Sequence, residues 1–429
     1  MSIVVCGAGA IGRGLLGELA ARADWPLTFI ETQPGLAREL AAAGAYTVHL
    51  VGQATVTTRV ARYRVLTPAQ PDEIAAAVRD CRLAATAVGG ANLPAAAALL
   101  APSLAARSTP LPVLVCENWP QADRTLAEAL RRHGAPDTAF ACLPCSVERM
   151  VRRDGMGLDL IGESGESACV AADVPLPGFQ VCPDLTPYYA RKLYTNNAGH
   201  ALLAYEGFLA GCQTLCAALD QPAIRTRLEA LLAGAAEMLA RTYGLPARAL
   251  DEHVDRLVRF RFANVRLADR VDRVARQPLR KLGPQERLVG LLRQLTPLGL
   301  PLQPVCRTIA AALCYDDPCD EESQQLQALV RRGGPGHVLA TVCQLEPAED
   351  GHRRCLAEWL AHGWSYPRLM RSGLTLPSMG LRERARPAVT SGRWISFALM
   401  SLPTGLPERL LVWIRSVDLW ETDPRQTAL

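Results

Sequence analysis

The sequence has little net charge and no uninterrupted apolar run long enough to cross a membrane. Its 46 Lys and Arg residues and 42 Asp and Glu residues leave a formal charge of +4 over 429 residues. This excess is too small to indicate a nucleic-acid or membrane-surface protein. The uncharged residues 83–106 are long enough to span a bilayer, but Gly89-Gly90, Asn92 and two prolines break the stretch into shorter elements. We therefore expect neither a membrane nor a nucleic-acid partner.

The sequence also lacks a recognisable secretory leader and a metal-binding motif. The apolar residues 3–6 begin almost at the first residue, which leaves no room for a charged n-region and a cleavage site. Fourteen cysteines without such a leader fit free thiols in a reducing cytoplasm. Cys142 and Cys145 form one C-x-x-C pair, but neither a second pair nor a local His pair accompanies it. We expect a cytoplasmic protein with no metal.

The first residues have the pattern of a dinucleotide-binding fold. The strand-like residues 3–6 lead into G-x-G-x-x-G, and leucines then recur at helical spacing. In this motif the first Gly allows a tight turn, the second lets a pyrophosphate approach the backbone, and the third lets helix and strand pack closely. The pyrophosphate would lie at the N-terminus of the helix, where N–H groups are unpaired. From this loop we expect cofactor contacts by Gly7, Gly9, Ala10, Ile11, Gly12 and Arg13.

A second predicted strand, residues 27–30, ends at Glu31, nineteen residues after Gly12. An acid at this place can accept a hydrogen bond from the adenine ribose, and its charge repels a 2′-phosphate. The following residues, Thr32 and Gln33, are not basic. The sequence therefore predicts NAD rather than NADP as the cofactor.

Two later strand-like runs, residues 84–88 and 112–116, end in residues that can face the same cofactor. Ligands of open α/β sheets bind outside the carboxyl ends of the strands. We therefore include Val88 and Gly89 among the predicted cofactor contacts. Asn118, which follows the later strand, has two interpretations, a residue that faces the cofactor or an ordinary turn residue.

An amine, two carboxamides and an imidazole lie close together between Lys192 and His200. No proline interrupts this stretch, so we predict a helix that presents these groups on one face. A buried Lys with a lowered pKa can take a proton from an alcohol, and an Asn can hold the resulting oxyanion. Helical spacing leaves open whether Asn196 or Asn197 does so. The competing interpretation is an ordinary amphipathic helix with a polar face.

Two further groups of charged residues have both a functional and a structural interpretation. Glu148 is either an active-site acid or the ion-pair partner of Arg149 or of another surface charge. The basic segment 273–282, which contains Arg280 and Lys281, can hold a substrate phosphate. The alternative for this segment is a solvated, salt-bridged start of a helix.

The pattern along the chain predicts an α/β protein in which an N-terminal Rossmann domain, with a doubly wound sheet, precedes a mostly α-helical C-terminal domain. Residues 1–186 form the predicted nucleotide-binding domain, and residues 187–363 read as helix after helix. Residues 364–429 are rich in Pro, Ser, Arg and Trp and form a tail of unknown structure.

Taken together, these motifs resemble the polyol-specific long-chain dehydrogenase/reductase family from residue 1 to about residue 345. The resemblance implies a Rossmann domain, a helical domain, an active site between them and no metal. Separate blocks in the same order carry it, namely residues 7–14, 86–89, 116–118, 191–200, 209–211 and 276–282.

The resemblance also implies roles for individual residues. The family pattern K-x(4)-N-x(2)-H falls on Lys192, Asn197 and His200. Lys192 would be the general base, Asn197 and Asn118 would hold the reacting oxygen, and His200 would orient the substrate. Substrate contacts are expected from Glu148, Arg149, Arg280 and Lys281.

The implied reaction is the NAD-dependent interconversion of mannitol 1-phosphate and fructose 6-phosphate by a monomer or homodimer. The alternatives are a related polyol or hexuronate dehydrogenase and a non-catalytic dinucleotide-binding protein. Two positions depart from the family pattern. Glu148 replaces the usual Asp, and Ala190 stands where relatives often carry an acid that can pass the proton to water. Proton exit would then need another route.

Overall fold

The computed structural model describes residues 1–52, 54–105, 107, 109–118, 121–164, 168–267 and 269–363. The predicted tail, residues 364–429, lies outside the described residues. Residues Met1–Trp359 form one compact unit. The proposed division of this unit at residues 186 and 187 stays a prediction.

The main sheet of the described part contains eight strands in the order β12-β11-β8-β7-β6-β1-β2-β5. Neighbouring strands from β8 to β5 are parallel, whereas β11 runs antiparallel to β8. The strands are β1 (Ile3–Cys6), β2 (Leu27–Ile30), β5 (Tyr63–Leu66), β6 (Leu83–Thr86), β7 (Leu111–Val115), β8 (Phe140–Val147), β11 (Ala168–Val170) and β12 (Gln180–Val181).

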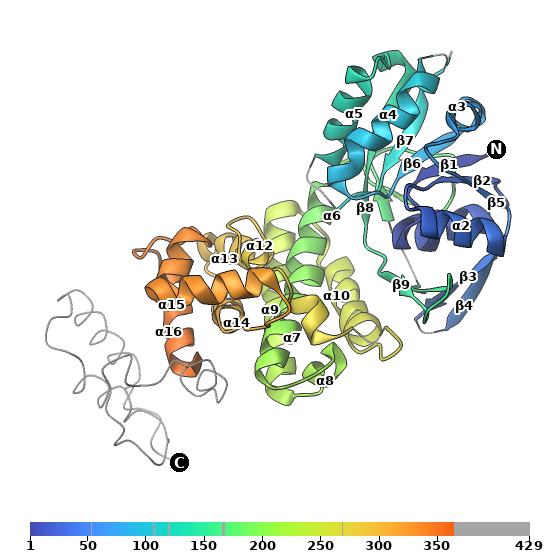
Figure 1. Ribbon diagram of the computed structural model, residues 1–429. Coiled ribbons are helices and arrows are strands. Elements are labelled where there is room, and N and C mark those ends of the chain that lie inside the picture. The colour runs from blue at the N-terminus through green and yellow to red at the C-terminus, as the bar shows by residue number, and fades with distance from the viewer. Residues whose placement is uncertain are drawn as a thin grey trace, which may run out of the picture. The chain divides into compact units, whose positions relative to one another are not determined.

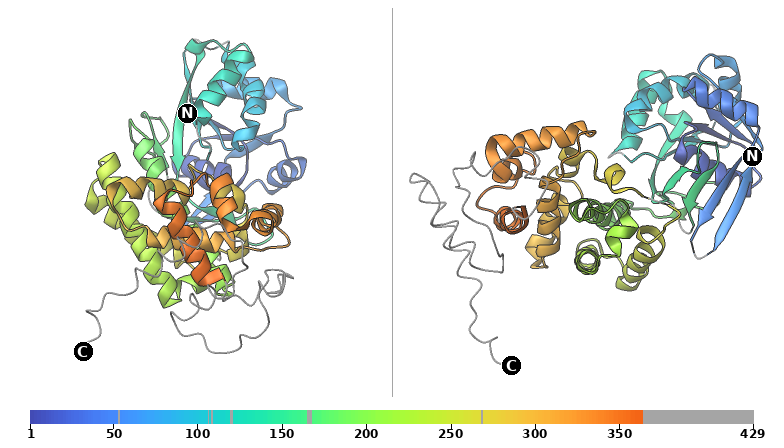
Figure 2. Two further views of the ribbon diagram at one scale, coloured as in Figure 1. Left: turned by 90° about the vertical axis from the view of Figure 1, so that its left-hand side faces the viewer. Right: turned by 60° about the horizontal axis from the view of Figure 1, so that its bottom comes forward.

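Helices cover both faces of the main sheet (Figures 1 and 2). Successive strand residues point to opposite faces, so Ile3 and Val5 join one apolar cluster while Val4 and Cys6 join another. Both clusters are buried, which confirms the predicted doubly wound arrangement. The first cluster is covered by η1 (Gly12–Gly17), α1 (Glu18–Arg22) and α2 (Pro34–Ala43), and the second by α3 (Pro71–Asp80), α4 (Leu93–Leu104) and α5 (Ala122–Arg132).

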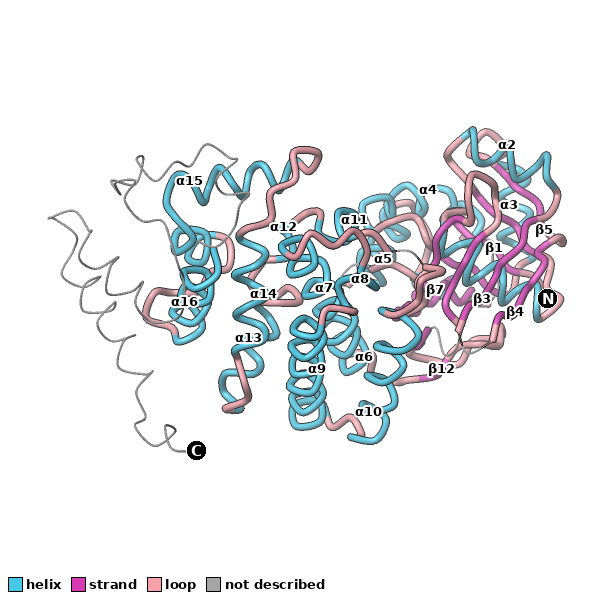
Figure 3. The backbone as a smooth tube through the Cα atoms, turned by 90° about the horizontal axis from the view of Figure 1, so that it is seen from below, coloured by secondary structure: helices cyan, strands magenta, loops and turns pink. Residues whose placement is uncertain are grey.

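A second, four-stranded sheet was not predicted from the sequence. Its order is β4-β3-β10-β9, and β3 and β4 lie side by side in Figure 3. Strand β4 is largely exposed, so it lacks the alternation of buried and exposed residues by which a strand is recognised in a sequence. The strands are β3 (Tyr46–Val51), β4 (Thr55–Val60), β9 (Val151–Arg153) and β10 (Leu160–Glu163).

Residues 186–363 are mostly helical, as predicted, and they bury a core of their own. A kink at Gly334 interrupts α15. None of the helices within the described ranges is long and apolar enough to cross a membrane. The α-helices are α6 (Thr186–Arg191), α7 (Ala198–Leu209), α8 (Leu215–Leu219), α9 (Pro222–Tyr243), α10 (Ala247–Arg256), α11 (Val271–Ala275), α12 (Pro278–Lys281), α13 (Val289–Leu295), α14 (Gln303–Leu313), α15 (Glu321–Thr341) and α16 (Asp350–Gly363).

Wide π-helical turns occur in both halves of the chain. One is η1 in the Rossmann half, and the others are η4 (Lys192–Asn197) and η5 (Leu257–Phe262) in the helical half. The remaining short turns are the 3₁₀ helices η2 (Gly90–Asn92), η3 (Asp137–Ala139) and η6 (Thr296–Leu298). Turns of the π type are rare and are frequent at functional sites. The predicted helix around Lys192 is therefore present, but the wider η4 turn changes the angles between its polar side chains.

Candidate active site

The glycine-rich loop after β1 has the geometry that a dinucleotide site requires. Gly7 has a φ of +93°, a conformation that L side chains rarely adopt. A Cβ at Gly12 would clash with the carbonyl oxygen of Gly7, so only glycine lets the two segments pack so closely. At Gly9, by contrast, an added Cβ would meet none of the described atoms within 4 Å. The loop is therefore tight inside and open at Gly9.

Arg13 does not have the role predicted for it. Its guanidinium donates hydrogen bonds to the carbonyl oxygens of Ala8 and Leu158, and it lies 5.6 Å from the centre of the Tyr46 ring. Only 1% of the residue is exposed. Its side chain supports the glycine-rich loop from inside the fold rather than reaching a bound cofactor.

Glu31, at the end of β2, is buried and binds the same loop. Its Oε2 accepts a hydrogen bond from the Ala8 N–H at 2.8 Å, and its Oε1 accepts one from the Gln33 N–H at 2.8 Å. A carboxylate has about four acceptor positions. It can therefore hold the loop and still accept a hydrogen bond from a ribose hydroxyl.

Glu117, two residues after the end of β7, does the same for the next loop, although no role was predicted for it from the sequence. Its two oxygens accept hydrogen bonds from the N–H groups of Val88 at 2.9 Å and Gly89 at 2.8 Å. Gly89 has a φ of +84°, so a glycine is favoured here. The available signal was an acid that follows a parallel strand, as Glu31 does.

The amine of Lys192 connects the helical half to the ends of two Rossmann strands. Its Nζ donates hydrogen bonds to Oδ1 of Asn118 at 3.1 Å and to the carbonyl oxygen of Val147 at 2.6 Å. Asn118 follows β7, and Val147 is the last residue of β8. The carboxyl edge of the sheet therefore fixes the position of the amine.

The surroundings of Lys192 favour its neutral form. Burial lowers the pKa of Lys192 to about 8, the Glu148 carboxylate opposes this shift, and the guanidinium groups of Arg261 and Arg287 add to it. An amine with such a pKa can act as a base near neutral pH. Neither Arg261, on η5, nor Arg287, in the turn before α13, was predicted as a site residue from the sequence.

His200 lies in the same electrostatic environment. Burial lowers its pKa well below the usual value, and Arg261, Arg273 and Arg287 lower it further. The imidazole is therefore neutral at physiological pH. Its ring packs edge-on against Phe262, with 4.9 Å between the ring centres. A neutral imidazole can both donate and accept a hydrogen bond, as the orientation of a polyol requires.

Glu148 and Arg149 are adjacent in sequence but have different partners. Glu148 accepts a hydrogen bond from Arg191 at 2.9 Å, one residue before the candidate base. Arg149 is buried, and its Nη1 lies 3.0 Å from both the Glu18 carboxylate and the Gly14 carbonyl oxygen. The Arg149 guanidinium thus has partners in η1 and α1, and the residue also lines the cavity beside Glu148, so its contact with a substrate stays a prediction. Glu148 remains beside Lys192.

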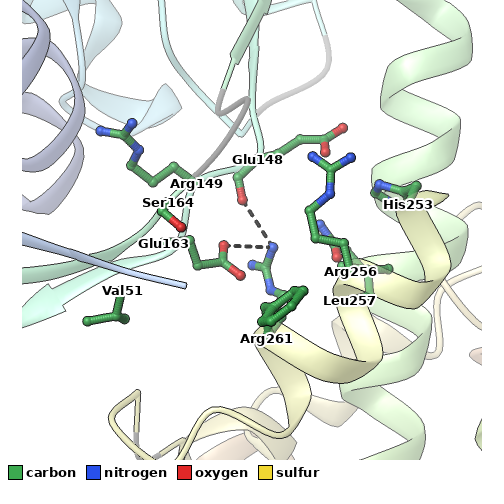
Figure 4. Close-up of a pocket in the computed structure, with 11 residues that line it drawn as sticks. Val51, Glu148, Arg149, Glu163, Ser164, His253, Arg256, Leu257 and Arg261 are labelled. Carbon is green, nitrogen blue, oxygen red and sulfur yellow. Dashed lines mark hydrogen bonds and ion pairs between the residues drawn. The ribbon is translucent and has the colours of Figure 1, made fainter. Parts of the chain in front are cut away.

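A polar cavity of about 50 Å³ lies next to η4 and η5 (Figure 4). Arg261, on η5, donates to the carbonyl oxygen of Glu148 at 3.1 Å and lies 3.2 Å from the Glu163 carboxylate. Asn196 lines the cavity, is 1% exposed, and forms no side-chain hydrogen bond with the described residues. Asn197 is partly exposed. The two carboxamides thus differ in surroundings, since Asn196 lines the cavity and Asn197 is the more exposed, and the assignment of Asn197 to the substrate stays a prediction.

A buried hydrogen-bond chain holds the η4 turn. The Thr195 hydroxyl donates to the carbonyl oxygen of Arg191 at 2.6 Å, and Nε2 of His253 lies 2.9 Å from the same hydroxyl. Because the hydroxyl proton is used, the imidazole must be the donor in the second bond. Burial lowers the pKa of His253 to about 4, which keeps the ring neutral.

The predicted phosphate-binding residues lie on α12. Lys281 is buried, and its Nζ donates to the carbonyl oxygens of Val274 and Arg276. Burial, reinforced by nearby arginines, lowers the pKa of Lys281 to about 7. Arg280 is about half exposed, and its guanidinium lies 3.8 Å from the Glu286 carboxylate. Of the two, Arg280 is the better placed to meet a solvated anion.

Comparison with known proteins identifies the family. Residues 1–146 match the family model described as mannitol dehydrogenase Rossmann domain, and residues 184–340 match the mannitol dehydrogenase C-terminal domain. The chain belongs to the mannitol dehydrogenase family. It is therefore a dinucleotide-dependent oxidoreductase, and not a protein that merely resembles one in its glycine-rich loop.

Relatives of this mannitol dehydrogenase family member include two enzymes named mannitol-1-phosphate 5-dehydrogenase. The one from Bacillus pumilus is 35% identical over 375 residues, which cover 82% of this chain and 98% of the relative. The one from Pseudarthrobacter chlorophenolicus is 32% identical over 364 residues, which cover 81% and 94%. The fold is similar to that of Pseudomonas fluorescens mannitol 2-dehydrogenase, solved with NAD and D-mannitol, with a TM-score of 0.66 and 17% identity over 88% of this chain and 93% of that one.

In this mannitol dehydrogenase family member, the two cysteines of the C-x-x-C pair do not face each other. Cys142 packs against the apolar cluster on one face of the main sheet, whereas Cys145 belongs to the cluster on the opposite face. Residues three apart on a strand point to opposite sides. Among the described residues, no three His, Cys, Asp or Glu side chains gather as a possible metal site.

Proposed function

We propose that this chain is an NAD-dependent dehydrogenase that interconverts D-mannitol 1-phosphate and D-fructose 6-phosphate. The observation that carries the proposal is the partly buried Lys192 amine, bound to Asn118 and Val147 at the carboxyl edge of the sheet, with a pKa of about 8. Relatives that share about a third of its residues over most of its length are named for this reaction.

In the proposed mechanism, neutral Lys192 removes the proton from the hydroxyl group at the carbon that is oxidised. Asn118 and Asn197 donate hydrogen bonds from their amide groups to the oxygen as its negative charge develops. NAD, when bound, accepts the hydride from that carbon. Neutral His200 orients the neighbouring hydroxyl groups. Catalysis then rests on positioning and on stabilisation of the oxyanion, without a covalent intermediate.

The residues of the Rossmann half fit a dinucleotide without a 2′-phosphate. Gly9 leaves the loop open where a pyrophosphate would approach. Glu31 places a buried carboxylate beside that loop, where it can accept a hydrogen bond from the ribose and would repel an added phosphate. Gly7, Ala10, Ile11 and Gly12 would line the rest of the loop, and Val88 and Gly89 would line the next one.

The phosphate end of the substrate is assigned to the basic segment around α12. Arg280 is partly exposed, and Arg287 contributes positive charge both to Lys281 and to the candidate base. Guanidinium groups bind phosphate through paired hydrogen bonds. Lys281, whose amine already has two carbonyl partners, would support this site from beneath.

A second candidate is a related dehydrogenase of an unphosphorylated polyol. The observation that favours it is that Arg280 and Lys281 already have partners within the protein. Their positive charge would then be structural. The two candidates differ in how Arg280→Ala acts. A phosphate site predicts a large rise in KM for fructose 6-phosphate and little change for fructose, whereas equal changes favour the unphosphorylated substrate.

The decisive experiment measures NADH oxidation with fructose 6-phosphate by the wild type and by Lys192→Ala. Turnover by the wild type that falls by at least about a hundredfold in the variant supports both the reaction and the base. Lys192→Arg is the matched variant, because it keeps the charge but cannot act as a base near neutral pH. NADH binding without turnover of any sugar by the wild type would instead indicate a non-catalytic dinucleotide-binding protein.

A further inference from the structure

One carboxylate in the basic segment lies between two guanidinium groups. The Oε2 of Glu286 lies 3.0 Å from Nη2 and 3.2 Å from Nε of Arg287, and its Oε1 lies 3.8 Å from Nη1 of Arg280. The Glu286 side chain is 29% exposed and that of Arg280 is 48% exposed. The Arg287 side chain is only 11% exposed. A dissolved anion can therefore reach Arg280 from solvent, and it reaches Arg287 only when the Glu286 carboxylate moves away.

The other nearby acids bind differently. Asp320 accepts a hydrogen bond from the backbone N–H of Gln277, and Glu322 accepts one from the backbone N–H of Arg280. These bonds fix α12 and the start of α15 without using the guanidinium of Arg280, which donates to Oε1 of Gln277 at 3.3 Å. Among the described residues, Glu286, which follows the basic segment, is the acid that pairs with both guanidinium groups.

This arrangement lies against the segment that carries the candidate base. A Cβ added to Gly290, in the first turn of α13, would lie 3.1 Å from the hydroxyl oxygen of Tyr194. Tyr194 belongs to η4, two residues after Lys192. Gly290, three residues after Arg287, therefore packs beside η4, and the charges of Arg287 and Glu286 act on Lys192 and Tyr194 in that turn. One end of a hexitol chain would lie here when its other end meets the base.

We propose that Glu286 is an internal competitor for the phosphate of the substrate and thereby a determinant of specificity, an inference that rests on the proposed function. In the free enzyme the carboxylate holds Arg280 and Arg287 in place. A phosphate dianion has more charge and more acceptor oxygens than a carboxylate, so it displaces Glu286 from the arginines. The hydroxymethyl group of a free sugar has no charge with which to do so. The site thus favours phosphorylated substrates.

The test compares wild type with Glu286→Gln, which keeps the size of the side chain and removes its charge. We expect the KM for fructose 6-phosphate to fall by about three- to tenfold, as expected for loss of a partly solvated competing charge. The Kd of inorganic phosphate, measured by calorimetry, should fall by a similar factor, whereas the KM for free fructose should not fall. Glu321→Gln, at the exposed start of α15, removes the same charge nearby and should leave both constants unchanged.

Three results would overturn the inference. The first is an unchanged or raised KM in Glu286→Gln, which would mean that the carboxylate only positions the arginines. The second is an equal fall in Glu321→Gln, which would mean that general charge explains the effect. The third is an unchanged Kd for inorganic phosphate. A wild type that does not reduce fructose 6-phosphate, combined with tighter binding of inorganic phosphate by Glu286→Gln, would refute the proposed reaction and support the competitor role.

Discussion

The amine of Lys192 donates a hydrogen bond to Oδ1 of Asn118 over 3.1 Å, across 74 residues of sequence. Because the amine points at the amide oxygen, the amide N–H groups of Asn118 are directed elsewhere and can donate to a substrate oxygen. In the proposed mechanism one side chain therefore both holds the base and contributes to the oxyanion site. This double role makes Asn118 a sharp test of the proposed mechanism.

Replacement of Asn118 should have different effects depending on the charge introduced. Asn118→Ala removes one donor from the developing oxyanion, so we expect kcat to fall by about a hundredfold. Asn118→Asp places a negative charge beside the amine and raises the pKa of Lys192. The pH at which polyol oxidation reaches half its maximal rate should then rise in the Asp variant but not in the Ala variant. Identical pH profiles for both variants would contradict the contact.

The pH dependence of the reaction should report the pKa of Lys192. Oxidation of the polyol needs the neutral amine, so its kcat/KM should rise with pH and level off above about 8. Reduction of the ketose needs the protonated amine as a proton donor, so its rate should fall as the pH rises through about 8. Rate measurements in both directions between pH 6 and pH 10, a range set by the ordinary pKa of about 10.4 for Lys, test this. Profiles with the same slope in both directions would contradict the assignment.

Arg261 should help to set this pKa, because its guanidinium favours the neutral form of Lys192. Arg261→Gln should move the profile for polyol oxidation to higher pH and lower kcat/KM at pH 7 by about threefold, the effect of one partly screened charge. Arg259 lies in the same π-helical turn and pairs with Asp255 at the surface, so Arg259→Gln serves as the matched control. A loss of activity at every pH without a shift of the profile would indicate that Arg261 only holds Glu148 and Glu163.

The strands that frame the cofactor loop could be predicted because their sequences are apolar and end in glycine or acid. The predicted strands 3–6 and 27–30 match β1 and β2, and the two later ones match β6 and β7 to within two residues. Strand β4 could not be predicted in this way. Its residues Thr55–Val60 are mostly exposed, so its sequence does not show the alternation of apolar and polar residues that packing on a core produces.

The candidate site was predictable where its chemistry is local and not where distant segments meet. Lys192 was recognisable from its neighbours, but its bond to the Val147 carbonyl oxygen follows from the sheet edge rather than from spacing. Arg261 was missed because a helical arginine usually faces water, and only its contacts with Glu148 and Glu163 show otherwise. Arg149 gives the opposite case. It follows the candidate site residue Glu148 in the sequence, yet its side chain is a buried partner of Glu18.

Glu31 should determine both the affinity for the cofactor and the choice between NAD and NADP. In Glu31→Gln, the side-chain NH₂ group must face the N–H of either Ala8 or Gln33, because both oxygens of Glu31 are acceptors in the native loop. We expect the Kd of NADH to rise about tenfold, as for a lost charge-assisted hydrogen bond. We also expect the ratio of the Kd of NADPH to the Kd of NADH to fall. Fluorescence titration with both cofactors measures this. Glu39→Gln, on the exposed face of α2, is the control. An equal loss in both variants would point to general charge.

His253 should make the fold less stable in acid. Burial lowers its pKa from the ordinary value of 6.5 to about 4, so the folded state favours the neutral ring. Its contribution to the free energy of unfolding is present above pH 6.5 and is lost as the pH falls from 6.5 toward 4. The reason is that the unfolded chain binds a proton in this range and the folded chain does not. By linkage this amounts to a loss on the order of 3 kcal/mol. Urea unfolding at pH 7 and near pH 4, the two sides of the unperturbed His value of about 6.5, should show a smaller fall in His253→Gln than in wild type. The exposed His133→Gln should behave like wild type, and a fall in His253→Gln as large as in wild type would show that other groups govern acid unfolding.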